Sequence, residues 1–366
     1  MTTRLQLVAA VIAALFTTLA IGNDSNDDVP LRLAVLGCGH GHVEGLLWHA
    51  QRRDDVELVG IWDRDSALRD RMAEKYAVDD AVLFDDLHEL LNEAKPEAVA
   101  INSPTSQQLA LVQASVGTAS VVMVEKPLGM SAAEVEAMRA AANEAGSTIV
   151  VNYETTWYAS LAELKRRVDA GELGTIRRLV AHHGHLGPIE IGCSDDFLAW
   201  LLDTEQNGGG ALPDFGCYGL NHAYWLFGGR KPVSVMASMR TLKPDKYAGA
   251  EDDATVLLDY GDAEVVIHAS WAWPDSRKRL WVYGDKGWAV PYEGDRLEIT
   301  IGDRETQQIT APPLTGADRD MFAMMKRVAR GGEPGGLSSF ENAVFVREML
   351  DAAAESAEQG RAIVVE

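Results

Sequence analysis

From residue 31 onward the chain alternates short aliphatic and β-branched runs with helix-length amphipathic segments, and this alternation limits the possible folds more than any other feature. Five runs have the length and composition of buried strands: 31–36, 56–62, 98–102, 120–124 and 148–152. The amphipathic segments between them are 41–53, 66–76, 87–94, 106–116 and 131–145. Because strands joined by helices form right-handed crossovers, the pattern predicts an α/β domain with a parallel, doubly wound sheet over residues 31–152.

The pattern changes after residue 153, where strand-like runs follow one another at short spacing. Beyond a strand-like stretch at 176–186, these runs are 233–239, 254–260, 263–270, 279–283, 288–291 and 297–301. Turn sequences such as Tyr260-Gly261-Asp262 separate them, as in β-hairpins. Helices are predicted at 161–170, 214–226, 318–329 and 339–358. Residues 153–366 are therefore expected to form an α+β domain with a large, mostly antiparallel open sheet that helices cover on one face.

The first 22 residues carry a single charge, Arg4, which is followed by an apolar run from residue 5 to residue 20. A helix that spans a bilayer needs about 20 apolar residues, so this run is short for a membrane anchor. Small residues, Ala20 and Gly22, precede a polar and acidic stretch, and we interpret residues 1–22 as a secretory signal peptide. The protein is then exported, to the periplasm or the extracellular space, without stable membrane insertion after the signal is removed. An uncleaved amino-terminal anchor is the alternative.

The charge balance restricts the partners of the protein. Its 33 Lys and Arg residues stand against 55 Asp and Glu residues, which gives a formal net charge of −22. Proteins that bind nucleic acids concentrate positive charge on one face, so we expect no nucleic-acid partner. Three cysteines are too few for a disulfide scaffold, and we assign no disulfide to Cys193 and Cys217.

The first predicted strand runs directly into a loop with the sequence Gly37-Cys38-Gly39-His40-Gly41-His42. Gly37 and Gly39 allow a tight turn and a close approach of the backbone to a pyrophosphate at a helix amino terminus. The third position of this dinucleotide fingerprint is His42 rather than glycine. An ordinary strand-to-helix turn is the competing interpretation, because such a loop alone is weak evidence.

The end of the next predicted strand supports the dinucleotide interpretation. Asp63 comes 21 residues after His42, where a carboxylate can accept hydrogen bonds from ribose hydroxyls. Asp63 would repel a 2′-phosphate and so favours NAD over NADP, whereas the neighbouring Arg64 could attract one.

Four further motifs carry a resemblance to a known family. They are Asn102-Ser103-Pro104-Thr105-Ser106, Glu125-Lys126-Pro127, Gly171-Glu172-Leu173-Gly174 and the segment 208–218. Together they resemble the glucose–fructose oxidoreductase and inositol dehydrogenase (Gfo/Idh/MocA) family, in the family's order from residue 31 to about residue 360. The resemblance implies an amino-terminal Rossmann domain and a carboxy-terminal domain whose open sheet serves as an oligomer interface, in a homodimer or homotetramer. It also implies oxidation or reduction of a carbinol carbon of a carbohydrate or cyclitol with a nicotinamide cofactor.

The resemblance assigns roles to particular residues. Lys126 corresponds to the active-site lysine and Glu125 to its partner, while Asp214 and Tyr218 match a branch in which a tyrosine is the acid/base. A phenol with a pKa of about 10 needs a nearby cation to work near neutrality, which Lys126 could supply. The residues expected to bind the cofactor are Gly37, Gly39, His40, His42, Asp63, Arg64, Asn102, Pro104, Glu125 and Lys126. Those expected to contact the substrate are Lys126, Tyr153, His183, His185, Asp214, Tyr218 and Asn221.

Several positions depart from the family pattern and leave the substrate open. Gln108 stands where the family has a histidine, Thr156 where it has an arginine, and Asn221 where it has an aspartate. Strand alternation would place His183 and His185 on one face, as substrate contacts or as a solvent-facing cluster. We expect no metal there, because no acidic residue or cysteine falls at a ligand spacing.

These observations favour an exported, nicotinamide-dependent oxidoreductase with a tightly held cofactor. Tight binding would allow the enzyme to work outside the cytoplasm, where free dinucleotide is scarce. One alternative is a glycosidase or lyase that oxidises the sugar transiently, eliminates a substituent and reduces the sugar again, with no net redox change. Another is a non-catalytic sugar-binding protein on the same scaffold.

Overall fold

The computed structural model describes residues 29–365, so the predicted signal peptide at residues 1–22 lies outside the described residues. Within residues 29–365, no helix combines the length and the apolar character that crossing a membrane requires.

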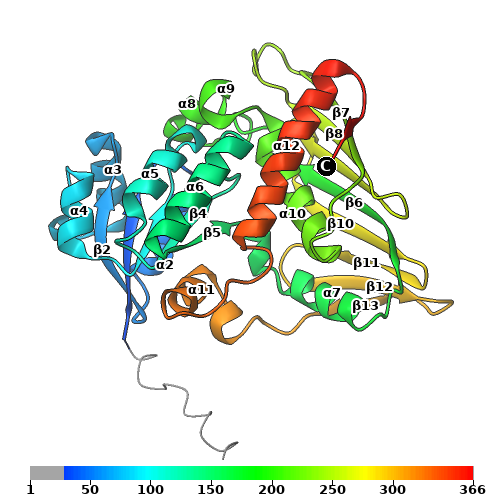
Figure 1. Ribbon diagram of the computed structural model, residues 1–366, viewed down its shortest axis with the longest axis horizontal. Helices are drawn as coiled ribbons and strands as arrows, with labels where there is room; N and C mark the ends of the chain where they lie inside the picture. The colour runs from blue at the N-terminus through cyan, green and yellow to red at the C-terminus, as the bar shows by residue number, and fades with distance from the viewer. Residues whose placement is uncertain (1–28, 366) are drawn as a thin grey trace, which may run out of the picture.

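The first sheet has five parallel strands in the order β2-β1-β3-β4-β5, and helices cover both of its faces (Figure 1). Its strands are β1 (Leu31–Leu36), β2 (Val56–Trp62), β3 (Ala98–Ile101), β4 (Val121–Glu125) and β5 (Thr148–Asn152). Its helices are α2 (His42–Ala50), α3 (Ser66–Tyr76), α4 (Leu87–Ala94), α5 (Gln108–Ser115) and α6 (Ala132–Ala145). Parallel strands that are buried on both faces have continuous apolar sequences, which is why the alternation of strands and helices could be recognised in the sequence. The predicted α/β class is confirmed.

Side-chain caps begin several of these helices. The Ser131 hydroxyl accepts a hydrogen bond from the Glu134 amide at the start of α6, as the sequence predicts. The Glu134 carboxylate accepts from the amide of Met130, one residue earlier than in a standard capping box. Asp65 and Asp86 cap α3 and α4 in the same way.

The second sheet has nine strands in the order β13-β12-β11-β10-β6-β9-β8-β7-β14. They are β6 (Ile176–Gly184), β7 (Ser234–Arg240), β8 (Asp253–Asp259), β9 (Glu264–Ser270), β10 (Arg277–Gly284), β11 (Gly287–Pro291), β12 (Arg296–Ile301), β13 (Gln307–Thr310) and β14 (Ile363–Val364). All neighbours are antiparallel except β6 and β9, which pair in parallel in the middle of the sheet. The sequence does not predict this pair, nor the short strands β13 and β14.

Helices pack on one face of the nine-stranded sheet, as predicted. α10 (Cys217–Leu226) lies against β6 and β9, and α12 (Phe340–Gln359) lies against β7. α12 also contacts α6 and β5 of the first domain, so it joins the two halves (Figure 1). α7 (Ala159–Asp169) covers β11 and β12.

Another late helix, α11 (Met321–Ala329), returns to the first domain. Its Phe322, Met325 and Val328 side chains share a core with strands of the parallel sheet. The ion pair between Arg53 and Asp320, at 2.7 Å, holds the start of this helix. The predicted boundary at residue 153 falls directly after β5. The core of the first domain nevertheless contains residues from both sides of this boundary.

Candidate functional site

A cavity of about 430 Å³ lies where the carboxyl ends of the first-sheet strands meet the second domain. The loop after β1 lines it with His40, Gly41 and His42, and the turn after β4 lines it with Lys126. The second domain contributes residues from the end of β6, from the start of α10 and from the start of β10: His185, Asp214, Tyr218 and Lys278. Ligands of α/β proteins bind at this edge of a parallel sheet, so the position is that of a binding site.

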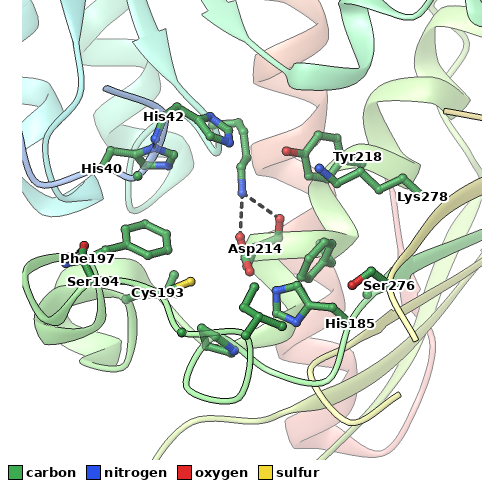
Figure 2. A pocket seen from close by; sticks show the side chains of 18 of the residues that line it. His40, His42, His185, Cys193, Ser194, Phe197, Asp214, Tyr218, Ser276 and Lys278 are labelled. Carbon is green, nitrogen blue, oxygen red and sulfur yellow. Dashed lines mark hydrogen bonds and ion pairs between the residues drawn. The ribbon is translucent and has the colours of Figure 1, made fainter. Parts of the chain in front are cut away.

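Lys126 and Asp214 form a buried ion pair that lines the cavity, and the dashed lines at Asp214 in Figure 2 mark its contacts. The Lys126 ammonium donates to the Asp214 carboxylate at 2.6 Å and to the Asp214 carbonyl oxygen at 3.0 Å. The other carboxylate oxygen accepts from the indole of Trp271 at 2.9 Å. Burial alone would raise the pKa of Asp214, but Lys126 lowers it to about 2, and Asp214 in turn raises the pKa of Lys126. Both groups are therefore charged at neutral pH.

A glycine run and a π-helical turn bring Asp214 to this place. Residues Leu212–Gly216 form the π-helical turn, which continues directly into α10. The Glu251 carboxylate accepts from the amides of Gly210 and Leu212, which satisfies donors at the start of the turn. A Cβ on Gly210 would lie 2.0 Å from the Glu251 carbonyl oxygen, so only glycine fits at that position.

Tyr218 lies four residues beyond Asp214, with its ring between two lysines. The Lys126 nitrogen lies 5.2 Å from the ring centroid and the Lys278 nitrogen 4.8 Å from it, so both cations lie beside the phenol. Figure 2 shows Tyr218 and Lys278 on one side of the ion pair, with His40 and His42 on the other. Burial raises the pKa of Tyr218 well above its ordinary value, so the phenol holds its proton at neutral pH. The predicted group of Lys126, Asp214 and Tyr218 comes together around one cavity.

Lys278 is a site residue that the sequence did not predict. It stands in a basic run at the start of β10, where no motif marks it, and it pairs with Glu154. Its position follows from strand register, because Lys278 lies opposite His183 in the pairing of β10 with β6. Such a long-range pairing has no local sequence signal.

Three residues expected to contact the substrate lie outside the cavity lining. His183 is fully buried on β6, behind Tyr218, with 5.7 Å between the two ring centroids. Tyr153 is also fully buried and packs against Tyr218 at 5.8 Å, while the Asn221 side chain donates to the Leu337 carbonyl oxygen. The expected shared face of His183 and His185 does not form around the cavity, because β6 ends at Gly184 and only His185 reaches the lining.

The buried histidines predict a loss of stability in acid. Burial lowers the pKa of His40 and His222 to about 3. An unfolded histidine titrates at about 6.5, so the unfolded chain binds more protons below that pH and the folded state loses stability as the pH falls from about 6.5 toward 3. We expect the free energy of unfolding to fall by about 2 kcal/mol per such histidine between pH 7 and pH 5.

Denaturant unfolding at several pH values measures this effect. His222→Gln should remove one histidine's share of the pH dependence, and His88→Gln, at an exposed histidine, is the control substitution. An identical slope in wild type and His222→Gln would contradict the prediction.

The glycine loop has the geometry that a dinucleotide needs. Gly37 has a φ of +87°, and a Cβ there would lie 2.8 Å from the Ser103 amide nitrogen. The Asn102 carbonyl accepts from the His40 amide and holds the loop against the end of β3, and Pro104 lies beside Gly39. Both polar atoms of the Asn102 side chain are buried without a hydrogen-bond partner, as expected of a group that a ligand engages. The loop residues therefore fit a dinucleotide.

Asp63 stands at the end of β2, beside this loop. Its carboxylate accepts from the amides of Cys38 and Asp65, at 2.5 and 2.7 Å, and burial raises its pKa. Each carboxylate oxygen keeps a second lone pair, with which it can accept from a ribose hydroxyl. Arg64 next to it is exposed.

His40, His42 and Glu125 form a hydrogen-bonded cluster between the glycine loop and the ion pair. The His42 ring lies 2.9 Å from the Glu125 carboxylate, whose other oxygen accepts from Asn152. Among residues 29–365, these three side chains are also the group whose ligand atoms lie close enough to hold a metal ion. The His42 amide donates to Nδ1 of His40, which leaves the proton of that neutral ring on Nε2, facing Glu125. In this tautomer Nε2 has no lone pair for a metal.

Gln108, which stands where the family has a histidine, supports the backbone of the turn after β4. Its side chain donates to the Glu125 carbonyl oxygen and accepts from the Gly129 amide. Both bonds are buried and hold the turn that carries Lys126. Gln108 does not line the cavity.

A short helix of the second domain lies over the glycine loop. α8 (Asp195–Leu201) begins at Ser194, whose hydroxyl accepts from the Phe197 amide. The indole of Trp200 donates to the Gly39 carbonyl oxygen at 3.0 Å, and Phe197 packs on His40. Helix α8 was not predicted from the sequence, although a serine followed by two aspartates is a helix-start signal.

Two family descriptions match the chain. "Oxidoreductase family, NAD-binding Rossmann fold" matches residues 31–153, and "GFO/IDH/MocA C-terminal domain" matches residues 161–290. Together they cover most of the chain and confirm the resemblance seen in the sequence.

Curated relatives are similar at low identity. The trans-1,2-dihydrobenzene-1,2-diol dehydrogenase of Oryctolagus cuniculus is 28% identical over 208 residues, which are 57% of this chain and 59% of the relative. The match thus spans somewhat over half the length of such relatives. The D-glucoside 3-dehydrogenase of Escherichia coli (strain K12) is 24% identical, with 90% of this chain and 96% of the relative covered.

Solved structures share the whole fold. The inositol dehydrogenase homolog from Azotobacter vinelandii complexed with NAD+ has a TM-score of 0.80 and 19% identity, and the match covers 94% of this chain and 100% of that one. The aldose-aldose oxidoreductase from Caulobacter crescentus complexed with glycerol has a TM-score of 0.78 and 22% identity, with 92% and 100% covered. On its two matched domains, the chain belongs to the Gfo/Idh/MocA family of oxidoreductases.

Proposed function

We propose that the protein is a nicotinamide-dependent oxidoreductase that acts on a carbinol carbon of a carbohydrate or cyclitol. One observation carries this proposal: the Lys126–Asp214 ion pair and Tyr218 line the same cavity as the glycine loop. A proton-transferring phenol, a fixed cation and a dinucleotide cradle are what hydride transfer at an alcohol requires. Relatives named for D-glucosides, scyllo-inositol and D-xylose support the substrate class.

Gly37, Gly39 and Asn102 would hold the phosphates of the cofactor, and Asp63 its ribose hydroxyls. The bound nicotinamide supplies the hydride acceptor for oxidation and the hydride donor for reduction. Around the substrate, Lys126 polarises the oxygen of the reacting carbon. On reduction Tyr218 donates its phenol proton to that oxygen, and on oxidation its phenolate form accepts the hydroxyl proton. Asp214 fixes the lysine side chain through its two contacts with it and so acts as a positioning residue.

Cofactor content and turnover together test the proposal. Purified protein is denatured and the supernatant is examined for dinucleotide by absorbance near 340 nm and by mass spectrometry. Methyl glucosides, xylose and inositols are then screened for oxidation and for cleavage. Oxidised product with a reduced cofactor supports the proposal, whereas cleavage without net redox change supports the glycosidase or lyase alternative. The absence of any bound or bindable dinucleotide would overturn both enzymatic functions.

Asp63→Asn tests the preference for NAD. The amide keeps an acceptor oxygen for the Cys38 amide but removes the charge that repels a 2′-phosphate. We expect the ratio of kcat/KM with NAD to kcat/KM with NADP to fall at least about tenfold. One charged contact typically distinguishes two ligands by at least this factor. Arg64→Ala should move the same ratio the other way. A ratio unchanged in Asp63→Asn would contradict the role of Asp63.

We further propose that the protein is exported, with residues 1–22 removed, and that it holds its cofactor tightly through the catalytic cycle. Intact-mass measurement of material from the native host tests the cleavage, and retention of Met1 would contradict it. Cofactor that remains bound through gel filtration supports tight binding.

We also propose that the protein is a homodimer or homotetramer that pairs through the open face of the nine-stranded sheet. Multi-angle light scattering tests the oligomeric state, and a monomer would contradict it.

A further inference from the structure

A second cavity, of about 240 Å³, lies near the carboxyl end of α10, where Trp225 stands about two helical turns beyond Tyr218. Its walls come from the segment after β5, from α10 and α11, and from the loop that precedes α12. Among the described residues, none lines both this cavity and the catalytic one. The second cavity is therefore a separate compartment and not an extension of the active site.

Two tryptophans give this cavity apolar walls. The indole nitrogen of Trp157 donates to the Asn152 side chain at 3.1 Å, so its remaining surface is apolar. Trp225 lies close to the loop before α12, where a Cβ on Gly336 would be 2.9 Å from the indole ring. Tryptophan faces pack well against rigid ligands that combine apolar and polar surface.

Unpartnered polar atoms surround the same space. Thr156 Oγ1, Ser338 Oγ and Arg327 Nε are all buried without a hydrogen-bond partner, and all three residues line the cavity. Ser338 is fully buried. Buried donors and acceptors are normally paired, so these atoms are in place to bind hydroxyl groups of a ligand.

The charges in this cavity favour a neutral ligand. The guanidinium of Arg327 is balanced by Asp318, at 2.6 Å, which removes the attraction that an anion would need. The volume lies below the roughly 300–1,000 Å³ of sites for drug-sized molecules, and so suits a ligand with one ring. We propose that this cavity is a second binding site, which takes one neutral sugar unit between hydroxyl partners and indole walls.

Hydrogen bonds connect the second cavity with the active site. Trp157 donates to Asn152, Asn152 donates to the Glu125 carboxylate at 2.7 Å, and Glu125 directly precedes Lys126. A sugar that displaces Trp157 therefore acts on the turn that carries the catalytic lysine.

Saturation-transfer NMR on the full-length protein tests the site. The probes are the methyl glycosides of D-glucose, D-galactose, D-mannose and D-xylose, and the variant is Thr156→Val combined with Ser338→Ala. We expect at least one probe to bind wild type at a site whose affinity falls about tenfold in the double variant, as the loss of two hydroxyl partners implies. Thr310→Val, which alters an exposed threonine on β13, should bind like wild type.

Other outcomes would overturn the proposal. One is that every probe binds wild type and the double variant equally. Another is that Lys126→Met loses the same binding component. A third is that an aromatic compound such as indole binds and no sugar does. Trp225→Phe replaces the double variant if the latter does not fold, as judged by its melting temperature. Because NMR detects binding without turnover, a failure of the proposed dehydrogenase activity leaves this test unaffected.

Discussion

Replacing Lys126 with methionine is expected to lower kcat by about 10³-fold, the effect of removing one preorganised charge or donor from the reacting oxygen. The lysine is 6% exposed and its ammonium is held at 2.6 Å from Asp214, so no reorganisation is needed when negative charge develops on the substrate. Methionine keeps the length of the side chain and loses only the cation. Steady-state kinetics with the best substrate from the screen measure the change.

The same variant is expected to lose stability, because it leaves Asp214 buried without its partner. Breaking a buried ion pair from one side costs about 3–5 kcal/mol. Adding Asp214→Asn removes the stranded charge while the amide can still meet the Trp271 indole. The double variant should therefore regain stability without regaining activity, which separates unfolding from loss of catalysis. Full turnover in Lys126→Met would show that the cation has no part in the reaction.

Tyr218→Phe is the second large effect that we expect, with kcat lowered by about 10²- to 10⁴-fold, the usual contribution of a general acid or base. The ring stays in place between Lys126 and Lys278, so the cofactor should bind as in wild type and the melting temperature should change little. Kinetics as a function of pH provide a second measurement, because the rise in the rate of oxidation at alkaline pH, where the phenol begins to ionise, should be absent from the variant.

Tyr260→Phe is the matched control for this variant. Tyr260 is a buried tyrosine like Tyr218. Its hydroxyl has no hydrogen-bond partner, and its ring stacks on Phe227, outside the lining of the catalytic cavity. It should keep the kcat of wild type. If both tyrosine variants turned over at the same rate, the proton would have to pass through another group, and the cavity offers His185 as the next candidate.

Local sequence patterns were sufficient for the elements of the first domain and for the principal site residues. The strand β1 and the cap of α6 at Ser131 follow from apolar runs and capping residues, which act over a few positions. Lys126, Asp214 and Tyr218 were found because each lies in a motif with family resemblance, and the structure places them around one cavity.

The remaining features depend on contacts between distant parts of the chain. Lys278 reaches Tyr218 only through the register of β10 on β6, and β6 pairs with β9 in parallel without any local signal. Tyr153 and His183 have residue types that suit substrate binding, but packing places both behind Tyr218. Whether a polar residue faces a cavity or lies behind its wall depends on tertiary packing, which the periodicity of the sequence does not encode.

The return of α11 to the first domain has a consequence for the order of folding. Its apolar side chains complete the core on one side of a sheet whose strands were all synthesised by residue 152. Helices α2 and α3 pack on part of that side early, but the part that α11 covers stays exposed until residue 329 has left the ribosome. Between residue 152 and residue 329, about half of the translation time, the nascent chain offers this apolar surface to chaperones, and a fragment that ends at residue 152 should be recovered as aggregate.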